Sequence, residues 1–246
     1  MPVMTTPAAA LIQNAVDSQV DGIATTLVTP QALAGSVKAA KDAGIPVVGL
    51  NAGIEEYKDL GADMYFGSDE TVAGEAAGER LAAEGAKHPL CVIHQAGSVS
   101  LEARCAGVRA GVPATENIQV NGSDDAAVVS TLQAKLAQDP AIDYIVSLGA
   151  PIALDAIKAI DASGSAAKLV TFDLNQETAQ AVKDGTLEFS IDQQPYMQGF
   201  MAVTSLYLNI KNGNDLGGGE AVLTGPSFVD GENIDQILPF VQNGTR

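Results

Sequence analysis

Residues 21–51 read DGIATTLVTPQALAGSVKAAKDAGIPVVGLN, and residues 143–173 read DYIVSLGAPIALDAIKAIDASGSAAKLVTFD. Both stretches begin with an apolar run typical of a buried strand, continue through a helix opened by Pro30 or Pro151, and end in a second apolar run. Short buried strands that alternate with helices are typical of parallel sheets with helices on their faces. The sequence therefore predicts an α/β fold, and the duplication predicts two similar lobes of parallel β-sheet flanked by helices.

Each second apolar run ends on a polar side chain, Asn51 in the first copy and Asp173 in the second. Ligands bind outside the carboxyl ends of the strands in open parallel sheets. Two half-sites of this kind predict closure on a small polar ligand. A local role is an alternative for both residues, since Asn51 could serve a turn before Gly53 and Asp173 could cap the next helix.

Similar apolar runs along the chain predict strands at 22–27, 46–50, 64–67, 90–94, 144–148, 168–172 and 187–191. A helix over 71–84 carries Gly74 and Gly78 one turn apart, which would let it lie close against a neighbouring helix. A longer helix over 196–210 is expected to pack on a core through Phe200, Val203, Leu206 and Ile210.

Composition and charge narrow the possible functions. The chain has 246 residues, of which 46% are hydrophobic, and 13 basic against 30 acidic residues give a net charge of −17. Such a charge repels phosphate backbones and argues against a nucleic-acid partner. The first residues lack the basic and apolar segments of an export signal. Cys91 and Cys105 could form one disulfide or remain two buried thiols.

Signatures of catalysis and metal binding are missing from the sequence. No phosphate-binding loop, dinucleotide fingerprint or nucleophile elbow is found. The two histidines, His88 and His94, have no cysteine or carboxylate partners at zinc-like spacing. His88 is expected to be solvated, whereas His94 closes a strand where ligands bind and could be a ligand contact or a structural residue. We therefore expect no catalytic residue, no cofactor and no metal.

Several segments share a family likeness. VDGIATTLVTPQALAGSVKAAKDAGIPVVGLNAG resembles the signature of type I solute-binding proteins, the receptors of bacterial ABC sugar importers, of which the ribose-binding proteins are examples. YFGSDETVAGEAAGERL, LEARCAGVRAG and VTFDLNQETAQAVKDGTLEFSIDQQPYMQG follow the same family's pattern in the same order. The likeness extends from about Pro7 onward and is greatest to the branch that takes up monosaccharides and sugar alcohols.

The resemblance implies a periplasmic-binding-protein-like fold of two α/β lobes joined by three crossovers. Its N-lobe would comprise residues 1–68 and 196–222, and its C-lobe residues 69–195 and 223–246. The family's first strand–helix–strand unit has no equivalent in this sequence. We therefore expect a truncated N-lobe in which the strand at 22–27 lies at an exposed or repaired edge.

The resemblance also implies a set of ligand contacts. Asp173 and Gln193 match the acid and the crossover glutamine of the family, and Arg104 matches its R-x-x-G arginine. A hinge hydrogen bond is the alternative role for Gln193, and a salt bridge within one lobe is the alternative for Arg104. The ligand-binding residues expected from the resemblance and from strand ends are Thr26, Asn51, His94, Glu102, Arg104, Asp173 and Gln193.

These observations predict a non-enzymatic substrate-binding component of an ABC transporter. It would trap a monosaccharide or sugar alcohol by hinge closure and present the closed form to the ABC permease subunits in the membrane. The resemblance implies a periplasmic or lipid-anchored location. Two alternatives stay open, namely the effector-binding core of a LacI-like transcription regulator and a small α/β enzyme acting on sugars.

Overall fold

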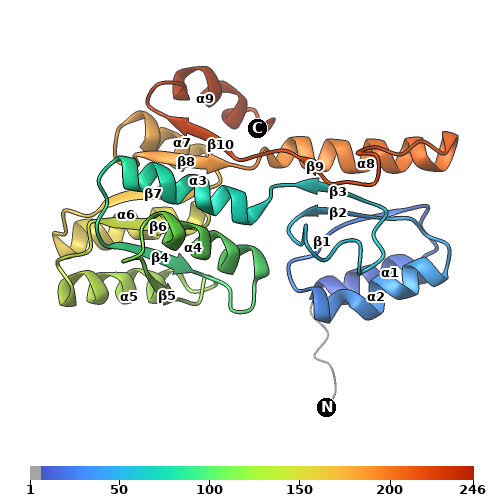
Figure 1. Ribbon diagram of the computed structural model, residues 1–246, viewed down its shortest axis with the longest axis horizontal. Helices are drawn as coiled ribbons and strands as arrows, with labels where there is room; N and C mark the ends of the chain where they lie inside the picture. Colours follow the sequence, from blue (N-terminus) through green and yellow to red (C-terminus); the bar gives the residue numbers. More distant parts are fainter. Residues whose placement is uncertain (1–6) are drawn as a thin grey trace, which may run out of the picture. The chain divides into compact units, whose positions relative to one another are not determined.

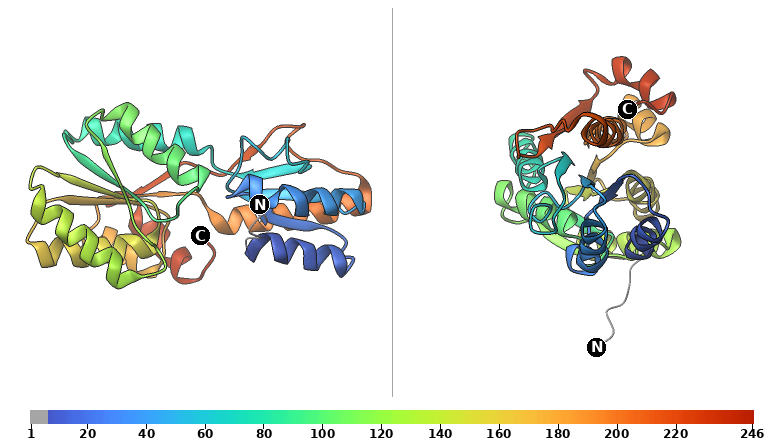
Figure 2. Two further views of the ribbon diagram at one scale, coloured as in Figure 1. Left: turned by 90° about the horizontal axis from the view of Figure 1, so that it is seen from below. Right: turned by 90° about the vertical axis from the view of Figure 1, so that its right-hand side faces the viewer.

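The computed structural model describes residues 7–246, and the chain divides into two compact units (Figure 1 and Figure 2). Unit 1 comprises the described residues up to Asp69 together with Gln194–Thr224. Unit 2 comprises Glu70–Gln193 together with Gly225–Arg246. The chain therefore passes from one unit to the other three times, after Asp69, Gln193 and Thr224.

Unit 1 is built on a four-stranded parallel sheet in the order β1-β2-β3-β9. The strands are β1 (Ile23–Thr26), β2 (Val47–Asn51), β3 (Met64–Gly67) and β9 (Val222–Leu223). One face of the sheet is covered by α1 (Pro7–Asp17) and α2 (Pro30–Asp42), and the other by α8 (Pro195–Asn212), as Figure 1 shows. Leu33, Val37 and Ala40 of α2 are buried, so the expected apolar face of this helix is confirmed.

Helix α8 differs from the expectation. Ala202 and Leu206 are buried against the sheet, but Phe200, Val203 and Ile210 are 57%, 64% and 42% exposed. A helix turns about 100° per residue, so Phe200 and Val203 lie away from the narrow face that Ala202 and Leu206 present, whereas Ile210 lies one turn after Leu206 on the same side. The prediction that all four apolar positions of this helix face a core is therefore wrong for Phe200 and Val203, and Ile210 is only partly covered, beside Gly22.

Unit 2 is built on a six-stranded sheet in the order β10-β8-β7-β6-β4-β5, parallel except for β10. The strands are β4 (Pro89–Ile93), β5 (Glu116–Gln119), β6 (Tyr144–Ser147), β7 (Lys168–Phe172), β8 (Phe189–Asp192) and β10 (Ser227–Asp230). One cluster of buried residues joins the sheet to α3 (Glu70–Ala83) and α4 (Val99–Gly111). A second joins it to α5 (Asp125–Gln138), α6 (Ala150–Ser163), α7 (Gln176–Lys183) and α9 (Ile234–Gln242). Both sheets thus have helices on their two faces, which confirms the predicted α/β class.

Helices α3 and α4 pack at very short range through glycine. A Cβ on Gly74 would lie 2.5 Å from the carbonyl oxygen of Arg104, and one on Gly78 would lie 2.8 Å from that of Gly107. The close approach expected from Gly74 and Gly78 is therefore confirmed. A disulfide between Cys91 of β4 and Cys105 of α4 ties the same helix to the sheet. These contacts hold α4 firmly where it carries Arg104.

The duplicated stretches fold alike, one in each unit. Strands β1 and β2 are parallel neighbours joined through α2, and β6 and β7 are parallel neighbours joined through α6. The residues that end the two copies also share a backbone conformation, with φ of 67° at Asn51 and 66° at Asp173. Left-handed backbone is uncommon outside glycine, and Asn and Asp tolerate it best. The repeat therefore extends to the geometry of its last residue.

Candidate functional site

The carboxyl ends of β7 and β8 bring two of the expected ligand-binding residues together in unit 2. Asp173 directly follows β7, Gln193 directly follows β8, and Gln193 Nε2 donates a 2.6 Å hydrogen bond to Asp173 Oδ1. The cap of α7 is Asn175, whose side chain accepts from the backbone of Thr178. The alternative of Asp173 as the N-cap of that helix is therefore wrong. The carboxyl group of Asp173 lies at the carboxyl end of β7 and does not cap α7.

Arg104 lies in the same unit as a buried cation with partners of its own. Its Nε donates to Glu70 Oε2 at 2.5 Å and its Nη1 donates to the carbonyl oxygen of Leu148 at 3.2 Å. The guanidinium carbon lies 4.5 Å from the ring centroid of Phe172, the residue before Asp173. A salt bridge within one lobe, the alternative for Arg104, is thus confirmed, and a ligand contact stays a prediction.

Burial and the charge of Arg104 shift the pKa values of two residues in unit 2, Asp173 and His94. Burial raises the pKa of Asp173, while the charge of Arg104 and the hydrogen bond from Gln193 act in the opposite direction. Burial also lowers the pKa of His94, and the charge of Arg104 lowers it further. Burial thus disfavours the ionised form of Asp173, Arg104 and Gln193 favour it, and His94 is a neutral imidazole at neutral pH.

His94 follows β4 and lines a cavity of about 590 Å³ at the carboxyl ends of β4 and β5. Its Nδ1 is buried and has no hydrogen-bond partner within the described part of the chain. A Cβ at Gly149 would lie 3.2 Å from His94 Cε1, so a glycine at this position makes room for the ring. The cavity is lined by His94, Gln95, Ala96, Gln119, Val120, Asn121, Gly122 and Ser123.

Unit 1 presents Thr26 at the end of β1 and Asn51 at the end of β2. The Oγ1 of Thr26 is buried and has no partner among residues 7–246. The backbone N–H of Ala52 donates to Leu50 O at 2.8 Å, and the N–H of Leu27 donates to Ala52 O at 3.1 Å. Asn51 therefore lies in a tight turn whose exit is tied to the neighbouring strand end, so its amide is fixed in position.

The remaining expected residue, Glu102, lies exposed in the first turn of α4. Sequence reasoning also missed some residues of unit 2. Glu70 lies 34 positions before Arg104, a separation that no local pattern connects. Gln119 and Asn121 reach the His94 cavity from β5, whose sequence ENIQ lacks the apolar run by which strands were recognised. The only sequence signal for this strand is the position of apolar Ile118 between the polar residues Asn117 and Gln119.

The chain is similar to known proteins in both sequence and structure. Residues 6–215 match the family described as "Periplasmic binding protein domain". The chain is 26% identical over 247 residues to the xylose/arabinose-binding protein XylF of Sulfolobus acidocaldarius, covering 92% of this chain. It spans 61% of the length of that curated relative. None of the helices within residues 7–246 combines the length and apolar character needed to cross a membrane.

Two solved structures are also similar to this chain. A carbohydrate transporter from Acidothermus cellulolyticus 11B, in complex with myo-inositol, is 52% identical with a TM-score of 0.95, covering 97% of this chain and 84% of that one. An ABC transporter solute-binding protein from Agrobacterium vitis with bound D-fucose is 25% identical with a TM-score of 0.81, covering 96% of this chain and 82% of that one.

Proposed function

This chain belongs to the periplasmic binding protein family, and we propose that it is the substrate-binding component of an ABC importer for a neutral monosaccharide or sugar alcohol. The observation that carries the proposal is the repeated strand end. Asn51 in unit 1 and Asp173 in unit 2 follow equivalent strands with the same left-handed backbone. Each unit therefore offers a fixed polar side chain at the edge where parallel sheets bind ligands.

The chemistry of these side chains suits a polyol. Each hydroxyl of a sugar is both a donor and an acceptor, and the carboxylate of Asp173 accepts two such hydroxyls in charge-assisted hydrogen bonds. The amides of Asn51 and Gln193 add both donors and acceptors. Thr26 Oγ1 and His94 Nδ1 are buried polar atoms without partners among the described residues, and ligand hydroxyls would satisfy them.

Among polyols, myo-inositol is the first candidate. The 52% identical transporter from Acidothermus cellulolyticus was solved in complex with it. A six-membered ring whose carbons all bear hydroxyls would need many polar contacts, which agrees with the polar lining of the His94 cavity and the strand ends. D-Xylose and L-arabinose are the next candidates because XylF is named for these pentoses.

We propose that one ligand is held by residues of both units and that binding thereby favours their closure. A ligand shifts a conformational equilibrium only through contacts that differ between its states. The lobes assigned from the resemblance, 1–68 with 196–222 and 69–195 with 223–246, end within two residues of the two compact units, which supports such a division. On the unit 1 side, Gln194 and Gln198 both bond to Thr224, linking two of the three crossover segments.

The membrane permease of an ABC importer is the proposed partner, and the proposed location is the periplasm or the cell exterior. The disulfide between Cys91 and Cys105 supports this location, because disulfides persist in oxidising compartments and are rare in the cytosol. Glu102 is exposed on α4, so we propose that it would contact the ligand only at the surface of unit 2.

Titration calorimetry of the purified chain tests the proposal. The titrants are myo-inositol, D-xylose, L-arabinose and D-fucose. We expect saturable binding of at least one, lost in Asp173→Ala and retained in Asp161→Asn, a matched change of an exposed carboxylate on α6. Absence of binding to any polyol would contradict the proposal. Turnover of a titrant would favour the enzyme alternative, and sugar-dependent binding to operator DNA would favour the regulator.

A further inference from the structure

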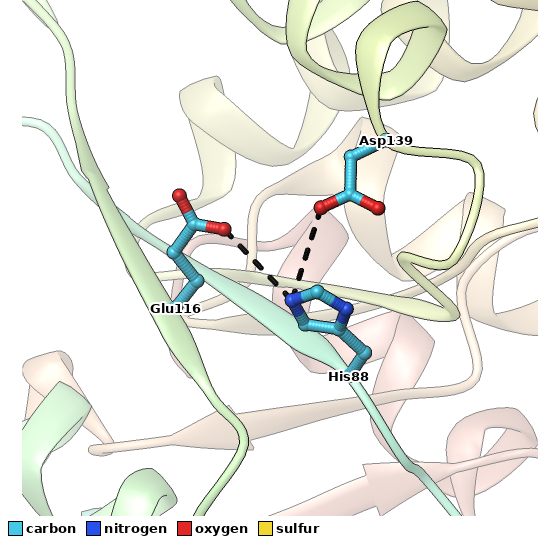
Figure 3. Close-up of side chains that lie close together, drawn as sticks. All are labelled: His88, Glu116 and Asp139. Carbon is cyan, nitrogen blue, oxygen red and sulfur yellow. Dashed lines mark ion pairs between the residues drawn. The ribbon is translucent and has the colours of Figure 1, made fainter.

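Three side chains converge in unit 2 at the amino ends of β4 and β5, the edge of the sheet opposite to Asp173 (Figure 3). His88 precedes β4, Glu116 begins β5, and Asp139 caps the end of α5. His88 Nε2 lies 3.8 Å from Glu116 Oε2 and 3.9 Å from Asp139 Oδ2. The ligand-capable atoms of all three lie within 4.8 Å of one another. His88 is 30% exposed, so it is only partly solvated, and it has two nearby carboxylates that zinc-like sequence spacing did not reveal.

The backbone around this cluster is well fixed. Asp143 accepts hydrogen bonds from the N–H groups of Lys87 and His88, at 2.6 and 2.9 Å. Glu116 is paired in register with Leu90 of β4. Asp139 Oδ1 accepts from the N–H of Ala141 at 3.3 Å, which turns Oδ2 toward the imidazole. The three side chains are thus aimed at one point by strand pairing, a helix cap and a loop anchor.

We propose that His88, Glu116 and Asp139 form a binding site for a divalent late first-row transition-metal ion, with Zn²⁺ as the representative ion. An imidazole nitrogen with two carboxylates suits Zn²⁺, Ni²⁺ and Cu²⁺, whereas Mg²⁺ and Ca²⁺ prefer oxygen ligands alone. Zinc bonds of about 2.0–2.2 Å in tetrahedral geometry place ligand atoms roughly 3.4 Å apart. The observed 3.8 and 3.9 Å separations from His88 need a closure of a few tenths of an ångström, and the two carboxylate oxygens, which lie within 4.8 Å of each other, need at most about 1.4 Å.

Such closure is open to these side chains. Those of His88, Glu116 and Asp139 are 30%, 44% and 26% exposed, so a metal ion can enter and the carboxylates can adjust. Solvent would complete the coordination, as at other sites with three protein ligands. The protein's net charge of −17 adds a general attraction for cations.

Lys135 is the competitor for this site. Its Nζ lies 2.7 Å from Glu116 Oε2 and 3.5 Å from Asp139 Oδ2. The ammonium group compensates the two carboxylates when no metal is present, and a metal must displace it. Lys135 therefore keeps the two carboxylates together and lowers metal affinity. Removing its charge should tighten metal binding, because it frees both carboxylates and removes the repulsion between the ammonium group and the metal ion.

A metal ion bound at this site would cross-link the edge of the sheet. β5 is the last strand of its sheet and pairs only with β4 among the described strands. A metal held by His88, Glu116 and Asp139 would join the start of β4, the start of β5 and the end of α5. Binding to the native state alone raises the melting temperature by mass action. The site is independent of the proposed sugar site, because it lies at the other ends of the strands.

The test uses the untagged, oxidised chain titrated with ZnCl₂ in calorimetry and in imidazole-detected NMR. His88 and His94 are the only histidines, so the spectrum contains two imidazoles. We expect one equivalent of Zn²⁺ to bind and to shift the His88 signals, leaving those of His94 in place. MgCl₂ at the same concentration should shift neither. Zinc binding that moves only His94, or no zinc binding, would overturn the proposal.

Two variants sharpen the test, and sugar affinity should stay unchanged in both. His88→Gln should weaken zinc binding by about tenfold or more, since it removes the nitrogen ligand. Lys135→Met should tighten it by about five- to tenfold, the size expected from removing one nearby surface cation. Lys168→Met is the matched control because Lys168 pairs with Glu188 elsewhere in unit 2. Equal zinc affinity in the wild type, Lys135→Met and His88→Gln would refute the site.

Discussion

Replacing Asp173 with asparagine should leave the stability of the ligand-free protein equal or higher, and should weaken ligand binding. Asparagine keeps the size and the acceptor oxygen that receives the 2.6 Å hydrogen bond from Gln193 Nε2. It also suits the left-handed backbone at this position, where φ is 66°. The substitution therefore changes the charge of the strand end and little else.

The effect on the ligand-free protein follows from the raised pKa of Asp173, which burial causes. The folded state holds this proton more tightly than the unfolded chain, so the group's contribution to stability is present below about pH 3.9 and is lost as the pH rises through the folded pKa. Above the folded pKa the ionised side chain is thus a net cost to the apo protein. Asp173→Asn removes that cost, and its melting temperature should equal or exceed that of the wild type.

The effect on the liganded protein has the opposite sign. A hydrogen bond to a charged group contributes about 1.5–3 kcal/mol, against about 1 kcal/mol for a neutral one. If two ligand hydroxyls lose the charged acceptor, the loss is about 1–4 kcal/mol, and the Kd should rise by roughly 5- to 700-fold.

Thermal unfolding without ligand and calorimetry with myo-inositol, both at pH 7.5, measure the two effects. Asp161→Asn, on the exposed side of α6, should leave both unchanged. The reasoning is refuted if Asp173→Asn melts several degrees lower than the wild type while binding the polyol as tightly. That result would make Asp173 a structural residue.

Three further results are expected. Wild-type affinity for the polyol should fall as the pH is lowered through the raised pKa of Asp173, because protons and ligand hydroxyls compete for the carboxylate, and calorimetry across pH should show no such fall in Asp173→Asn. Arg104→Met should lower the free energy of unfolding by about 3–5 kcal/mol, because it removes the charged partner of the buried Glu70 carboxylate, and urea melts should show partial recovery in Arg104→Met/Glu70→Met; a single variant as stable as the wild type would contradict the buried pair. Reducing the disulfide between Cys91 and Cys105, which lie 14 residues apart, should cost about 3 kcal/mol, and unchanged melting in dithiothreitol would speak against a stabilising bond.

Apolar runs were sufficient to predict much of the fold. All seven expected strands are present within two residues of their predicted ends, and the helix predicted over 71–84 is α3, Glu70–Ala83. The strand β5 was missed because ENIQ is partly exposed at a sheet edge and needs no continuous apolar run. The outward-facing apolar residues of α8 were misplaced because periodicity shows which residues share a face, not which face is covered.

In the candidate site, too, local features could be predicted from the sequence and long-range contacts could not. Asn51 and Asp173 could be found from sequence because a strand end is a local feature, and a parallel sheet brings such ends to one edge. The Glu70–Arg104 pair and the His88 cluster could not, because their members are separated by 34, 28 and 51 positions and are joined only by strand order and helix packing. Long-range charge pairs leave no periodic signal.

The charge arrangement of unit 2 also restricts the class of ligand. Arg104 is already paired with Glu70 and bonded to Leu148 O, so its positive charge is compensated within the unit. When ionised, Asp173 then contributes a partly desolvated negative charge at the strand edge, where His94 is held neutral. A sugar acid or sugar phosphate would bring a second anion against this carboxylate, and like charges at short range oppose binding. A neutral polyol instead donates hydroxyl protons to the same oxygens, so we expect the proposed site to favour uncharged sugars and inositols over their acidic or phosphorylated derivatives.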